Sequence, residues 1–250
     1  GKAAAQKALQ LDDTLPAAHA ALGQAHFLAW EWADWEKEFR RAIELDPSFA
    51  NAHHWFGLQS TWIGHYDEGI THLRRAVELD PLNLKFNDNL GQGLMNARMD
   101  DQALEQMKKT VDMDPNFAGT HIDLSTLYRY QGRYDLWLEE WKKNAELNNN
   151  ADDLSDIATI APILAKSGFK AAQTRYTELL VQRSTHTLVD PGLIANEFGY
   201  LGDKEQTFHW LEKAYAAKSE QVSLLRTMRC YDFVRTDPRF LDLIKRVGLP

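Results

Sequence analysis

A short Leu-Asp or Met-Asp sequence returns every 34 residues in the first part of the chain, and this spacing constrains the fold more than any single residue. A period of this length is typical of arrays in which each small unit packs only on its neighbours. The sequence therefore predicts a solenoid with an extended surface, which usually lacks a catalytic pocket. The four occurrences are Leu11-Asp12-Asp13, Leu45-Asp46-Pro47, Leu79-Asp80-Pro81 and Met113-Asp114-Pro115.

Each period contains two helical patterns separated by a turn. In residues 50–83 the turn lies at Gly64, and apolar or small residues then follow at spacings of three and four, which indicates a helix with one buried face. Asp80-Pro81 ends the unit, because the residue before a proline disfavours the helical conformation. The residues of the second helix that carry this pattern are Gly69, Ile70, Leu73 and Ala76.

In these features the chain resembles the tetratricopeptide-repeat proteins. A large and a small residue stand side by side on the first helix of each unit, as Leu22-Gly23, Phe56-Gly57, Leu90-Gly91 and Leu124-Ser125. The turn glycine of the motif is Gly64, Gly132, Gly168 and Gly202, whereas Trp30 and Arg98 replace it in two units. The resemblance implies an all-α fold, a right-handed α-solenoid (superhelix) of helix-turn-helix repeats with a C-terminal capping helix.

The repeat pattern divides the chain into consecutive segments. Residues 1–15 are expected to be the second helix of a truncated repeat, and residues 16–151 four units, at 16–49, 50–83, 84–117 and 118–151. Two divergent units are expected in 152–221 and a cap in 222–250. In the cap, a helix opening at Pro238 is expected to turn Phe240, Leu241 and Ile244 inward. The apolar face left at the N-terminal end predicts either a preceding unit or a homodimer through that end.

Three longer strings narrow the resemblance. LGDKEQTFHWLEKAY, RTDPRFLDLIKRVGLP and WEWADWEKEFRRAIELDP are similar to repeat regions of bacterial regulators. In those regulators the repeats lie C-terminal to a winged-helix DNA-binding domain, a Ser/Thr kinase or a nucleotide cyclase, none of which has its pattern here. The resemblance implies a non-catalytic scaffold or sensor region that binds protein. A free-standing adaptor is the alternative, and a small-ligand receptor or an enzyme is a third interpretation.

The family pattern also implies where a partner binds. Certain places on the first helices face the concave surface, and here they form an aromatic stretch followed by a polar one, as a peptide with apolar anchors requires. The alternative is that Phe27 and Trp55 only pack between units. A clamp for a C-terminal carboxylate is not expected, because only Asn89 matches it. The predicted peptide-binding residues are Gln24, Phe27, His54, Trp55, Leu58, Trp62, Asp88, Asn89, Gln92, Asn96, Asp123, Thr126, Arg129 and Tyr130.

Composition excludes several other functions. The net charge of −8 argues against a nucleic-acid partner, and no apolar run approaches the roughly 20 residues that cross a bilayer. A single cysteine, Cys230, excludes an internal disulfide and a cysteine-rich metal site, and fits a reducing, cytoplasmic location. There is no phosphate-binding glycine loop and no nucleophile elbow, so no catalytic residue and no cofactor is expected.

Histidines and tryptophans need separate interpretations. His19, His53 and His121 recur at one motif place, which predicts a structural role. His53, His54 and His65 lack carboxylates or thiols at ligand spacing, so no metal is expected there. Two tryptophans, Trp35 and Trp137, occupy a place that the motif gives to alanine. Either the helices splay apart there or the rings turn outward, and the sequence does not decide between these.

Overall fold

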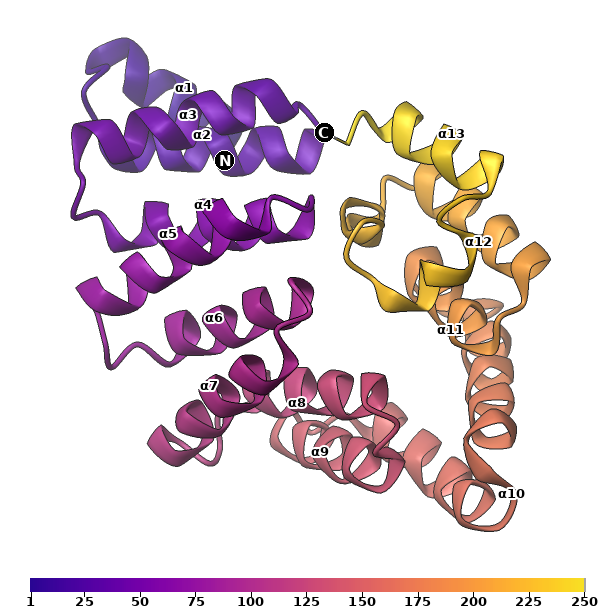
Figure 1. Cartoon of the computed structure of the whole chain (residues 1–250). Helices are drawn as coiled ribbons and strands as arrows, with labels where there is room; N and C mark the ends of the chain where they lie inside the picture. Colours follow the sequence, from indigo (N-terminus) through magenta and orange to yellow (C-terminus); the bar gives the residue numbers. More distant parts are fainter. Residues whose placement is uncertain (250) are drawn as a thin grey trace. The chain divides into compact units, whose positions relative to one another are not determined.

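The computed structural model describes residues 1–249, which over this range form α-helices and short 3-10 helices joined by turns (Figure 1). The helices are α1 (Lys2–Leu11), α2 (Pro16–Ala29), α3 (Trp32–Leu45), α4 (Ala50–Trp62), α5 (Tyr66–Leu79), α6 (Leu84–Asn96), α7 (Asp100–Met113), α8 (Ala118–Tyr130), α9 (Tyr134–Leu147), α10 (Ala151–Ser184), α11 (Pro191–Leu201), α12 (Lys204–Ala216), η1 (Glu220–Leu224), η2 (Arg229–Val234) and α13 (Pro238–Val247).

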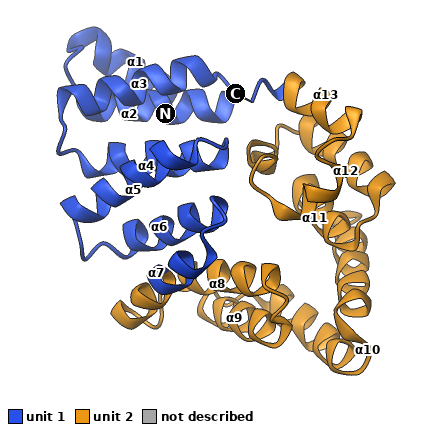
Figure 2. Cartoon of the chain, in the orientation of Figure 1, with its two compact units in different colours: residues 1–106, 247–250 blue, residues 107–246 orange. Residues whose placement is uncertain are grey.

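The chain forms two compact units, which are coloured separately in Figure 2. Unit 1 comprises residues 1–106 with 247–250, and unit 2 comprises residues 107–246. Within unit 1, α2 pairs with α3 and α4 with α5; within unit 2, α8 pairs with α9 and α11 with α12. The predicted all-α architecture of helix-turn-helix pairs is therefore confirmed. Among the described residues, no helix is both long and apolar enough to cross a membrane.

Small residues let the paired helices approach closely. A Cβ atom on Gly57 of α4 would lie 2.7 Å from the carbonyl oxygen of Gly69 on α5, which is closer than carbon and oxygen can pack. The large residue beside it, Phe56, is buried and stacks on Phe39 with ring centroids 5.7 Å apart. The large–small pair of the motif thus places one side chain between repeats and leaves room for backbone contact within a repeat.

The turns between paired helices all contain a residue with a positive φ. Gly64, Gly132, Gly168 and Gly202 have φ values of 98°, 72°, 78° and 69°. Trp30 and Arg98, which replace the turn glycine in two units, likewise have positive φ values, of 62° and 63°. In α10 this single residue, Gly168, separates two helical segments that otherwise run continuously from Ala151 to Ser184.

The two tryptophans that replace alanine both turn inward. Trp35 is 1% exposed, contacts Phe27 and Phe56, and donates a hydrogen bond from Nε1 to Gln59 Oε1 at 2.7 Å. Trp137 is 3% exposed and stacks on Trp141. Each ring therefore belongs to a buried aromatic cluster.

The C-terminal segment continues the repeat geometry without a regular first helix. In α13, Arg239 and Arg246 form ion pairs with Glu205 and Glu212 of α12, each pair separated by 34 residues. α13 therefore packs on α12 in the register of a further second helix, and the 3-10 helices η1 and η2 replace the first helix. The expectation that Leu241 faces inward is wrong, because this side chain is 55% exposed. The buried face is instead set by Phe240 and Leu243, one helical turn apart, with Ile244 half-buried.

Candidate protein-interaction surfaces

The predicted binding residues fall into two sets, one in each unit. In unit 1 they come from the first helices α2, α4 and α6, and α4 packs against both of the others. The structure buries Phe27, His54, Leu58, Asp88 and Asn89. It leaves half-exposed Gln24, Trp55, Trp62, Gln92 and Asn96. Only this second group, which we call the unit 1 inner face, is available to a partner without rearrangement.

Hydrogen bonds between successive first helices fix the unit 1 inner face. Gln59 Nε2 donates to Gln24 Oε1 at 2.9 Å, and Asn96 Nδ2 donates to Thr61 Oγ1 at 3.1 Å; in both pairs the residues are 35 positions apart. Trp62 Nε1 donates to Gln92 Oε1 at 3.2 Å. Because each bond joins one repeat to the next, the amide side chains are held in place before any partner arrives.

His54 belongs to the same set of inter-repeat bonds but lies beneath the surface. Its Nε2 atom lies 2.6 Å from Asn89 Oδ1, which can only accept, so Nε2 carries the proton. Burial lowers the pKa of His54 to about 4, although the hydrogen bond to Asn89 opposes this shift. His54 is therefore neutral near pH 7, and its Nδ1 atom has no hydrogen-bond partner within the described residues.

Two tryptophans supply the apolar part of the unit 1 inner face. Trp62 contacts the buried Phe27 ring with centroids 5.8 Å apart, so its position is set by the core. The Trp55 ring contacts His54, and the ammonium group of Lys85 lies 4.7 Å from the Trp55 centroid. The Trp55 ring thus packs against a neighbouring repeat and keeps an exposed edge, and a role in peptide binding stays a prediction.

In unit 2, the predicted residues on α8 are mostly engaged within the protein. Asp123 is buried, and the hydroxyl of Thr126 donates to the carbonyl of Ile122. Tyr130 donates to Met228 Sδ at 3.7 Å, and burial raises the pKa of its hydroxyl to about 12. These side chains therefore contribute more to packing inside unit 2 than to an open surface.

Arg129 is the centre of a buried polar cluster. Its guanidinium group pairs with the Glu197 carboxylate at 2.5 Å, also contacts Gln173 Oε1, and lies 3.5 Å from the centroid of the Tyr200 ring. The Arg129 and Glu197 side chains are only 9% and 11% exposed. Burial alone would lower the pKa of Arg129, but the Glu197 carboxylate raises it above its usual value. Arg129 is therefore a structural cation in this unit.

Arg129 contacts two side chains that the sequence did not predict as its partners, Glu197 and Gln173. Gln173 Nε2 also donates to Glu197 Oε2 at 2.7 Å, so the three side chains form one closed network. One signal was present, because Glu197 is the only charged residue in the α11 segment Pro191–Leu201. A lone charge in an otherwise apolar helix indicates a buried partner.

The inner side of α11 is covered by the chain itself. Gln221 Cβ would lie 2.5 Å from a Cβ on Gly192, and the carbonyl of Cys230 would lie 2.8 Å from one on Gly199. Between them Asn196 accepts a hydrogen bond from the Tyr231 hydroxyl at 2.5 Å. Segment 219–231 thus packs against α11 and covers Gly192, Asn196 and Gly199.

No protein-family model and no curated protein matches the chain. Several solved structures do resemble the chain in fold. PilF of Pseudomonas aeruginosa superposes with a TM-score of 0.55 at 16% identity, covering 85% of this chain and 96% of that one. PilW, a type IV pilus biogenesis factor, gives 0.54 at 14% identity, with coverage of 89% and 86%. A MamA structure gives 0.51 at 14% identity, with coverage of 70% and 96%. At such identities the likeness concerns the fold, and by fold the chain is a tetratricopeptide-like helical-repeat protein.

Proposed function

We propose that this chain is a non-catalytic protein-binding scaffold that holds an extended peptide segment of its partner on the unit 1 inner face. The observation that carries the proposal is the set of half-exposed aromatic and amide side chains, tied together by hydrogen bonds from repeat to repeat. A surface whose side chains are already ordered loses little conformational entropy when a partner binds.

The chemistry of this face indicates the kind of partner. Trp55 and Trp62 offer rigid apolar edges, which commonly dominate binding energy. Gln92 and Asn96 offer amide groups suited to backbone donors and acceptors of an extended chain, whereas the Gln24 amide has its Nε2 buried and its Oε1 bonded to Gln59. Because all five residues are uncharged, we expect the bound segment to present apolar side chains and to depend little on salt.

The biological setting is a second part of the proposal. We infer a sensor or recruitment region of a larger bacterial regulatory protein in the cytoplasm, on the resemblance of the three sequence strings described above. The alternative is a free-standing adaptor. An immunoblot of native cell extract with an antibody raised against this chain separates the two, since a regulator would run well above 28.6 kDa and an adaptor near it.

The binding proposal is tested with peptides selected by phage display on the full chain. Fluorescence polarisation then measures the affinity of a selected peptide for variants. We expect Trp55→Ala and Gln92→Ala each to weaken binding by about tenfold, the loss typical of an interface anchor. The matched control is Trp210→Ala, which removes a half-exposed tryptophan from the second helix α12. Equal affinity for all three variants, with unchanged circular dichroism, would place the peptide on another face.

A further inference from the structure

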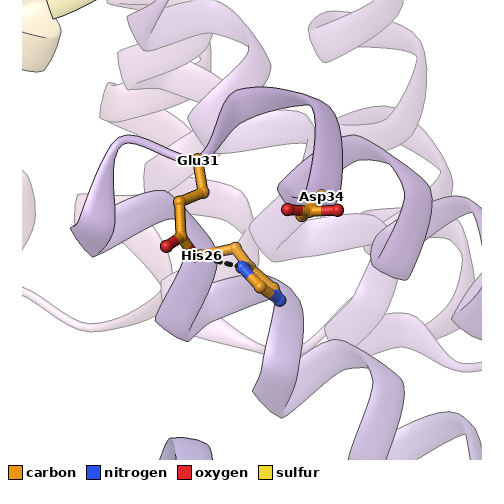
Figure 3. A group of neighbouring side chains, drawn as sticks. All are labelled: His26, Glu31 and Asp34. Carbon is orange, nitrogen blue, oxygen red and sulfur yellow. Dashed lines mark hydrogen bonds and ion pairs between the residues drawn. The ribbon is translucent and has the colours of Figure 1, made fainter.

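Three potential metal ligands converge at the turn between α2 and α3, as Figure 3 shows. They are His26, Glu31 and Asp34, and one ligand atom of each lies within 4.8 Å of the other two. This group lies outside the unit 1 inner face as we define it, and the proposed function does not use it.

The turn itself brings the three side chains together. His26 lies in the last turn of α2, Trp30 reverses the chain in the left-handed conformation, and Asp34 lies in the first turn of α3. Only this repeat of the four complete units places three ligand side chains at these positions. The corresponding residues in the other three units are Ser60, His65 and Glu68, then Leu94, Met99 and Gln102, then Tyr128, Arg133 and Leu136.

The group already attracts a cation. Lys2 Nζ lies 2.7 Å from Glu31 Oε2, and His26 Nδ1 lies 2.5 Å from the same oxygen. The hydrogen bonds from Lys2 and His26 lower the pKa of the Glu31 carboxyl. Asp34 has no hydrogen bond or ion pair within the described residues, so one carboxylate of the group stays unneutralised. Two carboxylates against one ammonium leave negative charge for a divalent ion.

We propose that His26, Glu31 and Asp34 bind one divalent transition-metal ion of the Zn²⁺ type, each residue giving one ligand atom and water completing the coordination. An imidazole nitrogen with two carboxylate oxygens suits Zn²⁺ and its neighbours, whereas Mg²⁺ and Ca²⁺ prefer oxygen ligands alone. On binding, the metal takes the place of the Nδ1 proton of the neutral His26 imidazole, which moves to Nε2 or to solvent, and of the Lys2 ammonium beside Glu31.

Isothermal titration of the full chain with ZnCl₂ tests the proposal. We expect one ion per chain, with affinity at least tenfold weaker in Asp34→Asn, because each variant of a three-residue site removes one ligand. His26→Gln should lose binding to a similar extent. The matched control is His209→Gln, an exposed histidine on α12, which should bind like the natural sequence. Zn²⁺ should also raise the melting temperature of the natural chain and not that of Asp34→Asn.

A further variant and a further ion make the outcome specific. Lys2→Met should tighten Zn²⁺ binding severalfold, since the competing ammonium is gone, and Ca²⁺ should give no measurable heat. The proposal is overturned if Asp34→Asn and the natural chain bind Zn²⁺ alike, if Lys2→Met has no effect on affinity, or if 1:1 binding is absent at about millimolar Zn²⁺. None of these results bears on the peptide-binding proposal, whose variants Trp55→Ala and Gln92→Ala lie elsewhere in unit 1.

Discussion

One motif place shows how a single residue ties a repeat together. His19, His53 and His121 each contact the backbone carbonyl six residues earlier, and Asn87 does the same in the remaining unit. Each also forms a hydrogen bond with a residue 19 positions later, on the second helix of the same repeat. Because these bonds join the two helices, the structural role predicted for the three histidines is confirmed. The partners are Glu38 at 2.6 Å, Gln106 at 3.0 Å, Glu140 at 2.6 Å and, for His53, His72 at 2.8 Å.

The His53–His72 pair predicts acid sensitivity in the repeat formed by α4 and α5. Burial lowers the pKa of His72 to about 4, and it also lowers the pKa of His53; Glu68 and Arg40 act on His72, and Asp46 and Arg75 on His53. Below pH about 6.5 the unfolded chain therefore binds protons that the folded chain does not. Through His72 the free energy of unfolding should fall by up to roughly 1.4 kcal/mol per pH unit between pH about 6.5 and about 4, and the lowered pKa of His53 adds to the fall in the same direction. Above pH about 6.5 this contribution to stability is fully present.

The variant His72→Glu restores the His–Glu pairing of the other repeats. We expect its melting temperature to fall less than that of the natural chain between pH 7.5 and pH 5, as measured by circular dichroism. His186→Gln, which changes an exposed histidine, serves as the control. Parallel pH profiles for the natural chain and His72→Glu would show that the histidine pair does not govern acid stability.

The Arg129–Glu197 pair yields a second prediction at this scale. Glu197→Ala leaves a guanidinium group buried without its counter-ion, which costs about 3–5 kcal/mol of unfolding free energy in comparable cases. The double variant Arg129→Met, Glu197→Leu should lose much less, because no charge remains to be desolvated. Urea unfolding measures both. The control is Glu146→Ala, which breaks the exposed Lys142–Glu146 pair and should cost under about 0.5 kcal/mol. Equal losses in the single and double variants would contradict the argument.

At the scale of the element, the turns between paired helices decide which residues the motif tolerates. All six turn positions have positive φ, including Trp30 and Arg98, whose side chains make this conformation less favourable than it is for glycine. Each helix pair therefore depends on one residue with a positive φ, and a non-glycine residue at that position costs about 1 kcal/mol.

This geometry predicts opposite effects for two substitutions. Gly132→Ala should lower the unfolding free energy by about 1 kcal/mol, because a Cβ there meets no heavy atom closer than 3.9 Å and only the backbone conformation changes. Arg98→Gly should raise the unfolding free energy by up to the same amount. The gain is reduced by any stabilisation that the contacts of the Arg98 side chain now provide. Ala165→Gly, at an exposed helical position, is the control and should destabilise. Urea midpoints report all three, and a destabilised Arg98→Gly would mean that its side-chain contacts outweigh backbone strain.

At the scale of the whole molecule, the sequence predicted the features that follow from the repeat period, such as the turns. It did not predict the contacts that form only when repeats stack on one another. The spacing of Gly64, Gly132, Gly168 and Gly202 located the turns, because turn geometry is a local property. The Arg129–Glu197 pair spans 68 residues and arises only when helices of different repeats are stacked, so no local pattern encodes it. For the same reason, the positions of the repeat motif identified residues on the first helices, but they did not show which of these residues are buried under their neighbours. His54 is one such buried residue.

The C-terminal segment provides the last prediction, since it closes the stack of repeats in unit 2. Deleting residues 218–250 removes Val222, Leu225 and Tyr231, all fully buried, and uncovers Asn196 on α11. We expect a melting temperature lower by several degrees or more, with aggregation on concentration, because apolar surface becomes exposed. The double variant Arg239→Ala, Arg246→Ala is the control. It removes exposed ion pairs, which are worth about 1 kcal/mol or less apiece, and the contacts of the two guanidinium groups with the Phe208 and Tyr215 rings of α12, but it leaves η1 and η2 in place. If the truncated chain melts like the natural one in differential scanning calorimetry, segment 219–231 is dispensable and the repeats of unit 2 are stable without it.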